Sequence, residues 1–315
     1  MVTRRTLLAS FGAAALVRAG PATVALLDDP RFVRGLSVIK ATPGVRIPAG
    51  DIVPRGSTGK PAWSGAQWYS RFNLAQAPRR LLPSGSSIFF DGAKSITFGA
   101  RGTREADIIF AVNGHTEYGD RAPAAGQPWP HLLAECELSH HPTIAELRAV
   151  PFRIQYRLLK SQAFHLPGWN SQRHTAQFQF YLTVRNANRA SKGYLDYLWF
   201  GVPMYDARTP LPRPFAAPDK GSALKVATGK FIFTPGGEPF SETPAQEGKW
   251  VPVDRDLLML IREALNAAWA AGYLQDSRRL EDYQLGGVNI GWEVTGPLDV
   301  AMQIRGLSFE ARTGA

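Results

Sequence analysis

The sequence predicts an all-β fold, an antiparallel β-sandwich or jelly roll with one amphipathic helix packed against it. Apolar and polar residues alternate with a period of two in many short segments after about residue 86, as in strands with one face on a core. The 30 glycines and 24 prolines are spread between these segments, as in a fold with many turns. A long helical period of apolar residues interrupts the strands at about residues 255–272.

Residues 1–19 have the features of an export signal. Arg4 and Arg5 precede a short apolar run, and the small residue Ala19 stands at the expected cleavage point. The paired arginines resemble the twin-arginine signal. The run is too short to span a bilayer, which needs about 20 residues. We therefore expect a protein exported by the twin-arginine route, periplasmic or secreted, that meets the membrane only for export; an uncleaved anchor is the alternative.

The mature chain is expected to hold an irregular N-terminal segment, residues 20–85, and a β-sandwich domain, residues 86–315. The first segment is rich in Pro, Gly and Ser, with an edge strand near residues 36–39. In the clearest strand, the core positions from Ala176 to Val184 alternate with Gln177, Gln179 and Tyr181. The predicted strands lie at residues 108–113, 132–139, 152–157, 174–185, 194–205, 288–294 and 298–305.

The predicted helix at about 255–272 has signals at both ends. Asp254 is a suitable N-cap residue, and Asp256 complements the helix dipole. Gly272 suits the left-handed position that ends many helices. The apolar stripe consists of Leu257, Ile261, Leu265, Ala268 and Trp269.

The strand faces that point away from the predicted core are rich in aromatic, amide and carboxylate side chains. If the strands are neighbours, this face suits a sugar, because C–H faces stack on Trp and Tyr while hydroxyls bond to Gln, Asn and Glu. An ordinary solvated sheet face is the alternative, although such a face is usually poorer in aromatic residues. The face comprises Glu135, Glu137, Gln177, Gln179, Tyr181, Tyr197, Trp199, Tyr205, Asn289, Glu293 and Gln303.

The carboxylates on this face permit a sharper hypothesis. Glycoside hydrolysis uses two carboxyl groups on either side of one bond, about 5 Å apart in retaining enzymes and farther apart in inverting ones. Glu293 with Glu135 or Glu137 supplies such a pair if their strands lie close together. In a hydrolase we expect Glu293 and Glu137 to be the catalytic residues.

The stretch from about 174 to 310 carries a resemblance to a known family. A strand at 174–184 precedes the strand Tyr194–Gly201, a helix and Gly272-Tyr-Leu274, and the late strand Asn289-Ile-Gly-Trp-Glu293 comes before Gly296. This order resembles the second half of family 12 endoglucanases, which are concanavalin A-like jelly rolls. The resemblance implies that Glu293 is the acid/base residue. The family's nucleophile, four residues before the Trp of the middle strand, falls on Leu195, and the adjacent Asp196 is expected to face the core.

Other features narrow the classes of function. A single cysteine, Cys136, excludes an intramolecular disulfide and alternates with apolar residues, so we expect a structural thiol. His140 and His141 are adjacent and diverge on a strand, so we expect no metal, and no cofactor motif is present. Asp206 and Arg208 are expected to pair and fix a loop. The formal charge of +10 comes without a dense Lys/Arg run, so we expect no nucleic-acid partner.

The leading hypothesis is an exported protein that binds a polysaccharide or oligosaccharide across its polar, aromatic sheet face. Tyr181, Tyr197 and Trp199 would stack on sugar rings. Hydrogen bonds would come from Glu135, Glu137, Gln177 and Gln179, with Asn289 and Tyr205 on the same face. The first alternative is an endo-acting glycoside hydrolase, and the second is a structural or interaction module of the cell envelope.

Overall fold

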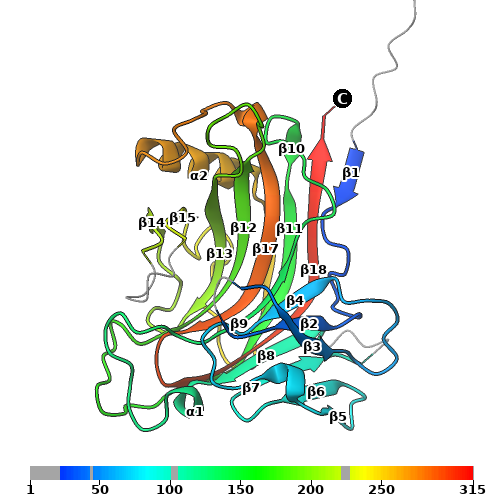
Figure 1. Cartoon of the computed structure of the whole chain (residues 1–315), viewed down its shortest axis with the longest axis vertical. Coiled ribbons are helices and arrows are strands. Elements are labelled where there is room, and N and C mark those ends of the chain that lie inside the picture. Colours follow the sequence, from blue (N-terminus) through cyan, green and yellow to red (C-terminus); the bar gives the residue numbers. More distant parts are fainter. Residues whose placement is uncertain (1–21, 43–44, 101–105, 221–227, 315) are drawn as a thin grey trace, which may run out of the picture.

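The computed structural model describes residues 22–42, 45–100, 106–220 and 228–314. The signal peptide expected at residues 1–19 lies outside the described residues. Within these ranges the chain folds into two large β-sheets packed face to face, which confirms the predicted all-β sandwich (Figure 1). No helix in these ranges is both long enough and apolar enough to cross a membrane.

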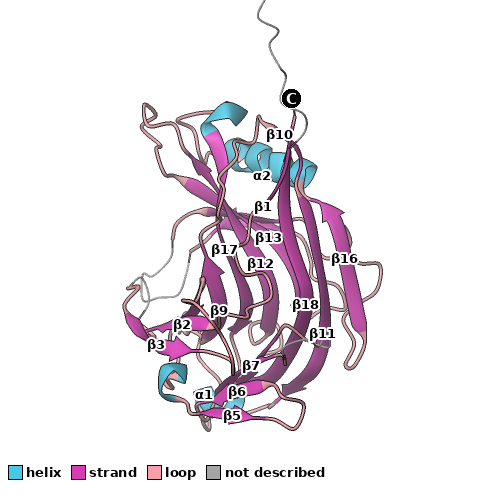
Figure 2. Ribbon diagram, turned by 90° about the vertical axis from the view of Figure 1, so that its right-hand side faces the viewer, coloured by secondary structure: helices cyan, strands magenta, loops and turns pink. Residues whose placement is uncertain are grey.

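One sheet, called here the outer sheet, has nine strands among the described residues. Its strands in spatial order are β16 (Trp250–Asp256), β11 (Pro151–Ala163), β18 (Leu298–Thr313), β8 (Ile108–Asn113), β7 (Lys94–Phe98), β6 (Ser87–Phe90) and β5 (Arg79–Leu81), with β1 (Ala22–Ala25) and β10 (Leu147–Ala149) also paired to β18. The long strands β11 and β18 curve along the whole molecule, as Figure 2 shows.

The second sheet, called here the cleft sheet, also has nine strands in the described ranges. Their spatial order is β14 (Phe215–Pro218), β15 (Phe231–Thr234), β13 (Tyr197–Asp206), β12 (Ala176–Asn186), β17 (Tyr283–Val294), β9 (His131–Cys136), β4 (Trp63–Ala66), β2 (Leu36–Ile39) and β3 (Pro48–Ile52). Neighbours are antiparallel apart from the pairs β13–β15 and β2–β4. The mostly antiparallel arrangement is therefore as expected.

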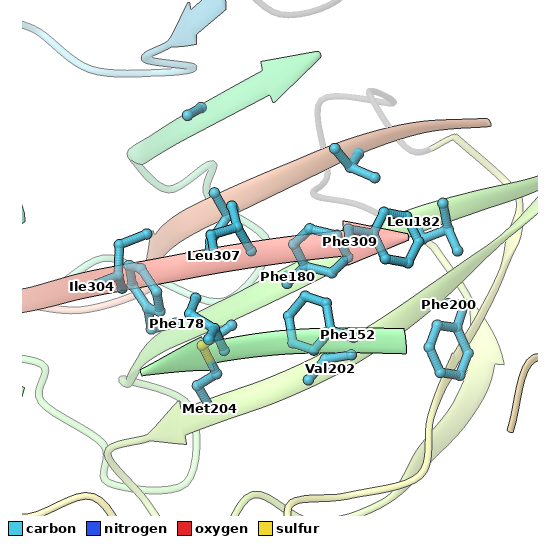
Figure 3. Close-up of a cluster of buried hydrophobic side chains, with 14 of the residues drawn as sticks. Phe152, Phe178, Phe180, Leu182, Phe200, Val202, Met204, Ile304, Leu307 and Phe309 are labelled. Carbon is cyan, nitrogen blue, oxygen red and sulfur yellow. The ribbon is translucent and has the colours of Figure 1, made fainter. Parts of the chain in front are cut away.

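The apolar faces of both sheets meet in one core. Phe178, Phe180 and Phe200 of the cleft sheet are fully buried, as the alternation in their strands predicts. Phe180 packs against both Phe152 and Phe309 of the outer sheet, with ring centroids 4.8 and 5.6 Å away (Figure 3). Burial of each such ring contributes about 1.5–3 kcal/mol, so this aromatic layer joins the two sheets strongly.

The segment 20–85 differs from the irregular structure that was expected. It contributes β1 and β5 to the outer sheet and β2, β3 and β4 to the cleft sheet. Trp63 is buried, and its indole N–H donates to the carbonyl of Asp29 over 2.7 Å. The strands are only three to five residues long and are separated by Gly and Pro, so their period of two is too short to stand out.

The predicted helix is α2 (Leu258–Ala270), which packs against β13 and β15. Its expected N-cap is wrong: Asp254 lies in β16, where it accepts a hydrogen bond from Arg153. Asp256 instead accepts from the backbone N–H groups of Val150 and Leu258. Gly272 has a φ of +86°, as the end signal predicted. The remaining helical segments are α1 (Gly114–Tyr118), η1 (Leu74–Gln76) and η2 (Leu280–Asp282).

Candidate functional site

The face of the cleft sheet that points away from the core lines a cleft of about 1660 Å³. Strands β9, β12, β13 and β17 form its floor. Its walls are loops, among them the segment 68–69, the loop before β9, the loop between β11 and β12, and the proline-rich loop after β13. A concave, partly apolar surface is the usual form of a ligand site, and this cleft is larger than the ~300–1,000 Å³ of a typical small-molecule pocket.

The strand register sets the floor residues side by side in rows. In one row Asp206, Gln177, Glu293 and His131 stand on four successive strands. A second row consists of Gly201, Tyr181, Asn289, Glu135 and Ser64. In the next rows Trp199 pairs with Thr183 and Tyr197 with Arg185. The structure therefore brings ten of the predicted residues to the cleft: Glu135, Glu137, Gln177, Gln179, Tyr181, Tyr197, Trp199, Tyr205, Asn289 and Glu293.

One end of the cleft, called the Glu293 end, consists of Tyr69, Trp129, His131 and Glu293. The indole N–H of Trp129 donates to Oε2 of Glu293 over 3.3 Å, and Nε2 of His131 lies 3.7 Å from the same oxygen. The His131 ring stacks on Trp129 at a centroid distance of 6.0 Å and lies 6.3 Å from Tyr69. Burial lowers the pKa of His131, although the nearby Glu293 acts in the opposite direction.

The other end, called the Trp199 end, consists of Tyr181, Tyr197 and Trp199. The Trp199 ring meets Tyr181 and Tyr197 edge to face, with centroids 6.0 and 5.3 Å apart. The Tyr181 ring lies against the backbone of β13, where a Cβ on Gly201 would stand 2.7 Å from its Cε1 atom. Burial raises the pKa of Tyr181, so this phenol remains neutral at any ordinary pH. These rings form a neutral aromatic surface.

Between the two ends, Glu135 stands on the floor as a buried carboxyl group. Its Oε2 atom lies 2.8 Å from the guanidinium of Arg46, which reaches in from the loop between β2 and β3. Burial raises the pKa of Glu135, and hydrogen bonds from Arg46 and Trp68 oppose that shift. Asn289 pairs with Glu135 on the neighbouring strand. An amide and a carboxyl group thus stand together in the middle of the cleft.

Tyr205 does not lie on the cleft floor as predicted. A β-bulge between Phe178 and Gln179 in the β12–β13 ladder places Tyr205 opposite the core residue Phe178. Its ring lies 5.8 Å from Trp292, and its hydroxyl donates to Ser161 of the outer sheet over 2.7 Å. Tyr205 therefore joins the two sheets at the margin of the cleft.

Gln303 is a second residue that the structure removes from the predicted face. It lies on β18 of the outer sheet, where its amide oxygen accepts a hydrogen bond from Nε of Arg157 over 2.9 Å. The alternation in its strand was correctly interpreted, but the strand belongs to the other sheet. A residue pattern of period two does not say which sheet a strand joins.

The proposed catalytic pair of Glu293 and Glu137 is not assembled. Glu293 pairs with His131, and Glu137 lies six residues farther along the same strand direction, about 20 Å away at the rise of a strand. Glu137 is 68% exposed and pairs with Arg185 over 3.4 Å. Neither the retaining nor the inverting separation of two carboxyl groups fits this distance.

The nucleophile position implied by the family resemblance, Leu195, lies even farther from Glu293 than Glu137 does. The N–H of Leu195 bonds to the carbonyl of Asn186, which lies nine residues along β12 from the partner of Glu293. That spacing corresponds to about 30 Å. Asp196 does not face the core as expected, because β13 begins only at Tyr197, and its carboxylate pairs with Lys230 over 2.6 Å.

The predicted pair of Asp206 and Arg208 is confirmed. Arg208 donates from Nε and one terminal nitrogen to the two carboxylate oxygens, over 3.0 and 2.6 Å. Thr175 and Gln177 also donate to Asp206. The pKa of Asp206 is lowered, because these hydrogen bonds outweigh its burial. This carboxylate fixes the start of the loop after β13.

Sequence reasoning missed the aromatic residues that line the cleft from loops. Trp68 and Tyr69 follow β4, Trp129 precedes β9, and Trp169 lies between β11 and β12. Loop residues have no period that assigns them to a face. The remaining sequence signal was composition, since tryptophan in a Gly- and Pro-rich loop suggests an exposed contact residue.

Comparison with known proteins finds solved structures with a similar fold but no matching family model or curated protein. No protein-family model matches the chain, and no curated protein matches it. An endoglucanase from Rhodothermus marinus aligns at 11% identity and a TM-score of 0.39, over 76% of this chain and 97% of its own. A family 12 xyloglucanase from Bacillus licheniformis aligns at 9% identity and a TM-score of 0.40, over 77% and 100%. A family 11 xylanase from Neocallimastix patriciarum gives 9% and 0.35, over 74% and 94%. Likeness at this level concerns the fold alone.

Proposed function

We propose that this protein binds a glycan chain along the cleft sheet without cleaving it. The observation that carries the proposal is one continuous cleft in which aromatic rings at both ends flank a floor of amide and carboxyl groups. Rings offer their faces to the C–H groups of sugars. Amide and carboxyl groups supply the fixed donors and acceptors that sugar hydroxyls require.

The order of groups along the cleft suits a chain of several sugar units. Rings at the Glu293 end and at the Trp199 end are separated by the middle row that holds Asn289 and Glu135. Tyr181 spans part of that distance on the floor. A glycan would stack at both ends and form hydrogen bonds between them, so affinity would grow with chain length.

Cleavage is disfavoured because Glu135, Glu137 and Asp206 are not placed or not free to act as the second catalytic group beside Glu293. Glu135 lies four residues along the neighbouring strand direction, about 13 Å away. Asp206 stands two strand spacings from Glu293, about 10 Å, and its oxygens are held by Arg208, Thr175 and Gln177. A carboxylate held in this way by three side chains is a poor nucleophile and a poor proton acceptor.

We also propose that the protein acts outside the cytoplasm, in the periplasm or after secretion. The proposal rests on the twin-arginine-type signal expected at residues 1–19. Replacement of both Arg4 and Arg5 by lysine should leave the full-length precursor in the cytoplasm. Cell fractionation measures this, and unchanged export of the variant would argue against the twin-arginine route.

The test of glycan binding is a panel of neutral and acidic polysaccharides, read both by pull-down and by release of reducing ends. We expect retention on at least one polysaccharide without new reducing ends. Trp199→Ala should lower the affinity about ten-fold, since stacking of one ring contributes on the order of 1–1.5 kcal/mol. Tyr194→Ala is the matched control, because Tyr194 is an aromatic residue of the same segment that is 40% exposed outside the cleft. Full affinity in Trp199→Ala would overturn the proposed site, and reducing ends lost in Glu293→Gln would show a hydrolase.

A further inference from the structure

We propose that the Glu293 end binds a protonated amine, so that the preferred glycan carries unacetylated amino-sugar units. This inference rests on the proposed glycan-binding function and specifies the chemistry of its ligand. It comes from a difference among the five carboxylates that line the cleft. Three of them have an arginine partner, Asp219 accepts hydrogen bonds from Thr228, and Glu293 has neutral aromatic neighbours.

The three carboxylates that already have a cation are spread over the cleft. Glu135 pairs with Arg46 over 2.8 Å and Glu137 with Arg185 over 3.4 Å. Asp206 has Arg208 at 2.6 Å. The protein therefore supplies its own positive charge to these positions. A cationic ligand would have to displace an arginine there, which gives little net electrostatic gain.

Glu293 is different. Its Oε2 atom accepts a hydrogen bond from the indole of Trp129 and lies near the imidazole of His131. Within the described ranges no Lys or Arg side chain lies within 4.0 Å of its carboxylate. The side chain is 26% exposed and lines the cleft, so a ligand can reach it.

His131 does not serve as the missing cation. Burial lowers its pKa below the usual value for histidine, so the ring is neutral at neutral pH. In that state it contributes a π-face and no charge. The Glu293 end therefore presents one negative charge in a wall of neutral rings.

The rings favour the same ligand chemistry. The rings of Trp129, His131 and Tyr69 follow one another at centroid distances of 6.0 and 6.3 Å beside the carboxylate. Aromatic faces attract ammonium groups, and a carboxylate within reach adds a charge-assisted hydrogen bond. A neutral hydroxyl group is attracted less strongly both to the aromatic faces and to the carboxylate. The combination therefore selects for a positively charged substituent.

The overall charge of the chain excludes non-specific attraction as the cause of a preference for amino-glycans. The formal charge of the full sequence is +10, so the long-range field of the protein repels a polycation. A preference for an amino-glycan therefore cannot arise from non-specific attraction. It requires a local negative site of the kind that Glu293 provides.

The test compares three β-1,4-linked oligosaccharides of equal length, built from glucose, glucosamine or N-acetylglucosamine. Affinities are measured by calorimetry at a pH at which the free amines are protonated. We expect the glucosamine oligomer to bind about ten-fold more tightly than the other two, equivalent to ~1.4 kcal/mol. The preference should decrease as salt is added, because it depends on charge attraction.

Glu293→Gln should remove the preference, so that the glucosamine oligomer binds the variant no more tightly than the two neutral oligomers. Glu281→Gln is the matched control, because it removes the same charge from a side chain that is 62% exposed and lies outside the cleft. Equal affinities for the three oligomers, or a preference that survives in Glu293→Gln, would overturn the inference and leave glycan binding intact. If none of the three oligomers and no polysaccharide of the wider panel binds, the proposed function itself fails. If Glu293→Gln does not fold, the salt series on the unaltered protein still tests the charge attraction, because a preference that does not change with salt would contradict the inference.

Discussion

At the Trp199 end of the cleft the aromatic rings stand on strands, whereas at the Glu293 end two of the three stand on loops. Tyr181, Trp199 and Tyr197 belong to β12 and β13, whose ladders fix their backbones. Tyr69 and Trp129 belong to the segments that flank β4 and β9. The difference teaches that the same kind of binding surface can be held either by sheet hydrogen bonds or by a separate anchor.

The anchor at the Glu293 end is a buried polar network that includes Ser70, the residue after Tyr69. Lys94 on β7 is fully buried and pairs with Asp91 over 2.8 Å and with Glu117 over 3.4 Å. It also donates to the hydroxyl of Ser70, which in turn donates to Glu117 over 2.5 Å. The residue next to Ser70 is Tyr69, whose φ of +58° is unfavourable for a side chain of that size. The network therefore holds the loop in a backbone conformation that it would not adopt alone.

The largest expected effect is that of breaking this anchor. Lys94→Met should destabilise the fold by about 3–5 kcal/mol, because two buried carboxylates lose their cation. Chemical denaturation measures the change. Lys230→Met, at the Trp199 end, is the matched comparison: its pair with Asp196 is about one-third exposed on both sides, so removal should cost at most ~1 kcal/mol. Equal losses in the two variants would contradict the difference between the ends.

The next effect concerns the strand-built end. Gly201→Ala should destabilise the protein by about 1–3 kcal/mol and weaken glycan binding, since the added methyl group would lie 2.5 Å from Thr234 and 2.7 Å from the Tyr181 ring. Gly65→Ala on β4 is the control, because the atoms nearest to its added Cβ are at ordinary contact distances of 3.4–3.5 Å. Thermal unfolding and glycan affinity are measured together. If Gly201→Ala changes neither thermal unfolding nor glycan affinity, the position of the Tyr181 ring does not depend on this close approach.

A third prediction separates strain from binding at the Glu293 end. Tyr69→Gly should change stability by less than about 1 kcal/mol, because relief of the left-handed backbone offsets the lost packing. Glycan affinity should nevertheless fall by up to ten-fold, since the ring is removed. A variant that unfolds as readily as Lys94→Met would show that the ring itself, rather than the network below, holds the loop.

The last effect is a pH dependence of stability that arises from His131. Its pKa is lowered in the folded protein, so the unfolded chain takes up a proton first as the pH falls. The contribution of His131 to stability is therefore constant above the ordinary pKa of about 6.5. Below that pH it decreases by at most ~1.4 kcal/mol per pH unit. His131→Gln should flatten this part of the stability profile, whereas substitution of the exposed His140 to Gln should leave it as in the unaltered protein. Denaturation between pH 7.5 and pH 5 supplies the measurement.

The comparison of the two ends also explains which site residues could be predicted. Gln177, Gln179, Tyr181 and Trp199 were assigned to one face because their strands alternate with buried residues, and all four line the cleft. Tyr205 was assigned by the same rule and is misplaced, because one extra residue in the β12–β13 ladder reverses the alternation. Trp129 was not assigned at all, since it precedes its strand.

The sequence by itself determined the fold class and the face of most strand residues, because the period of two is a local property that burial on one side imposes. Only the tertiary structure decided which strands are neighbours, in which register, and in which of the two sheets. Those choices depend on pairing between distant segments, which leaves no local pattern. They separate Glu293 from Glu137 and from Leu195, and they place Gln303 on the outer sheet. They also bring Trp129 to Glu293, a cleft carboxylate that has no arginine partner among the described residues.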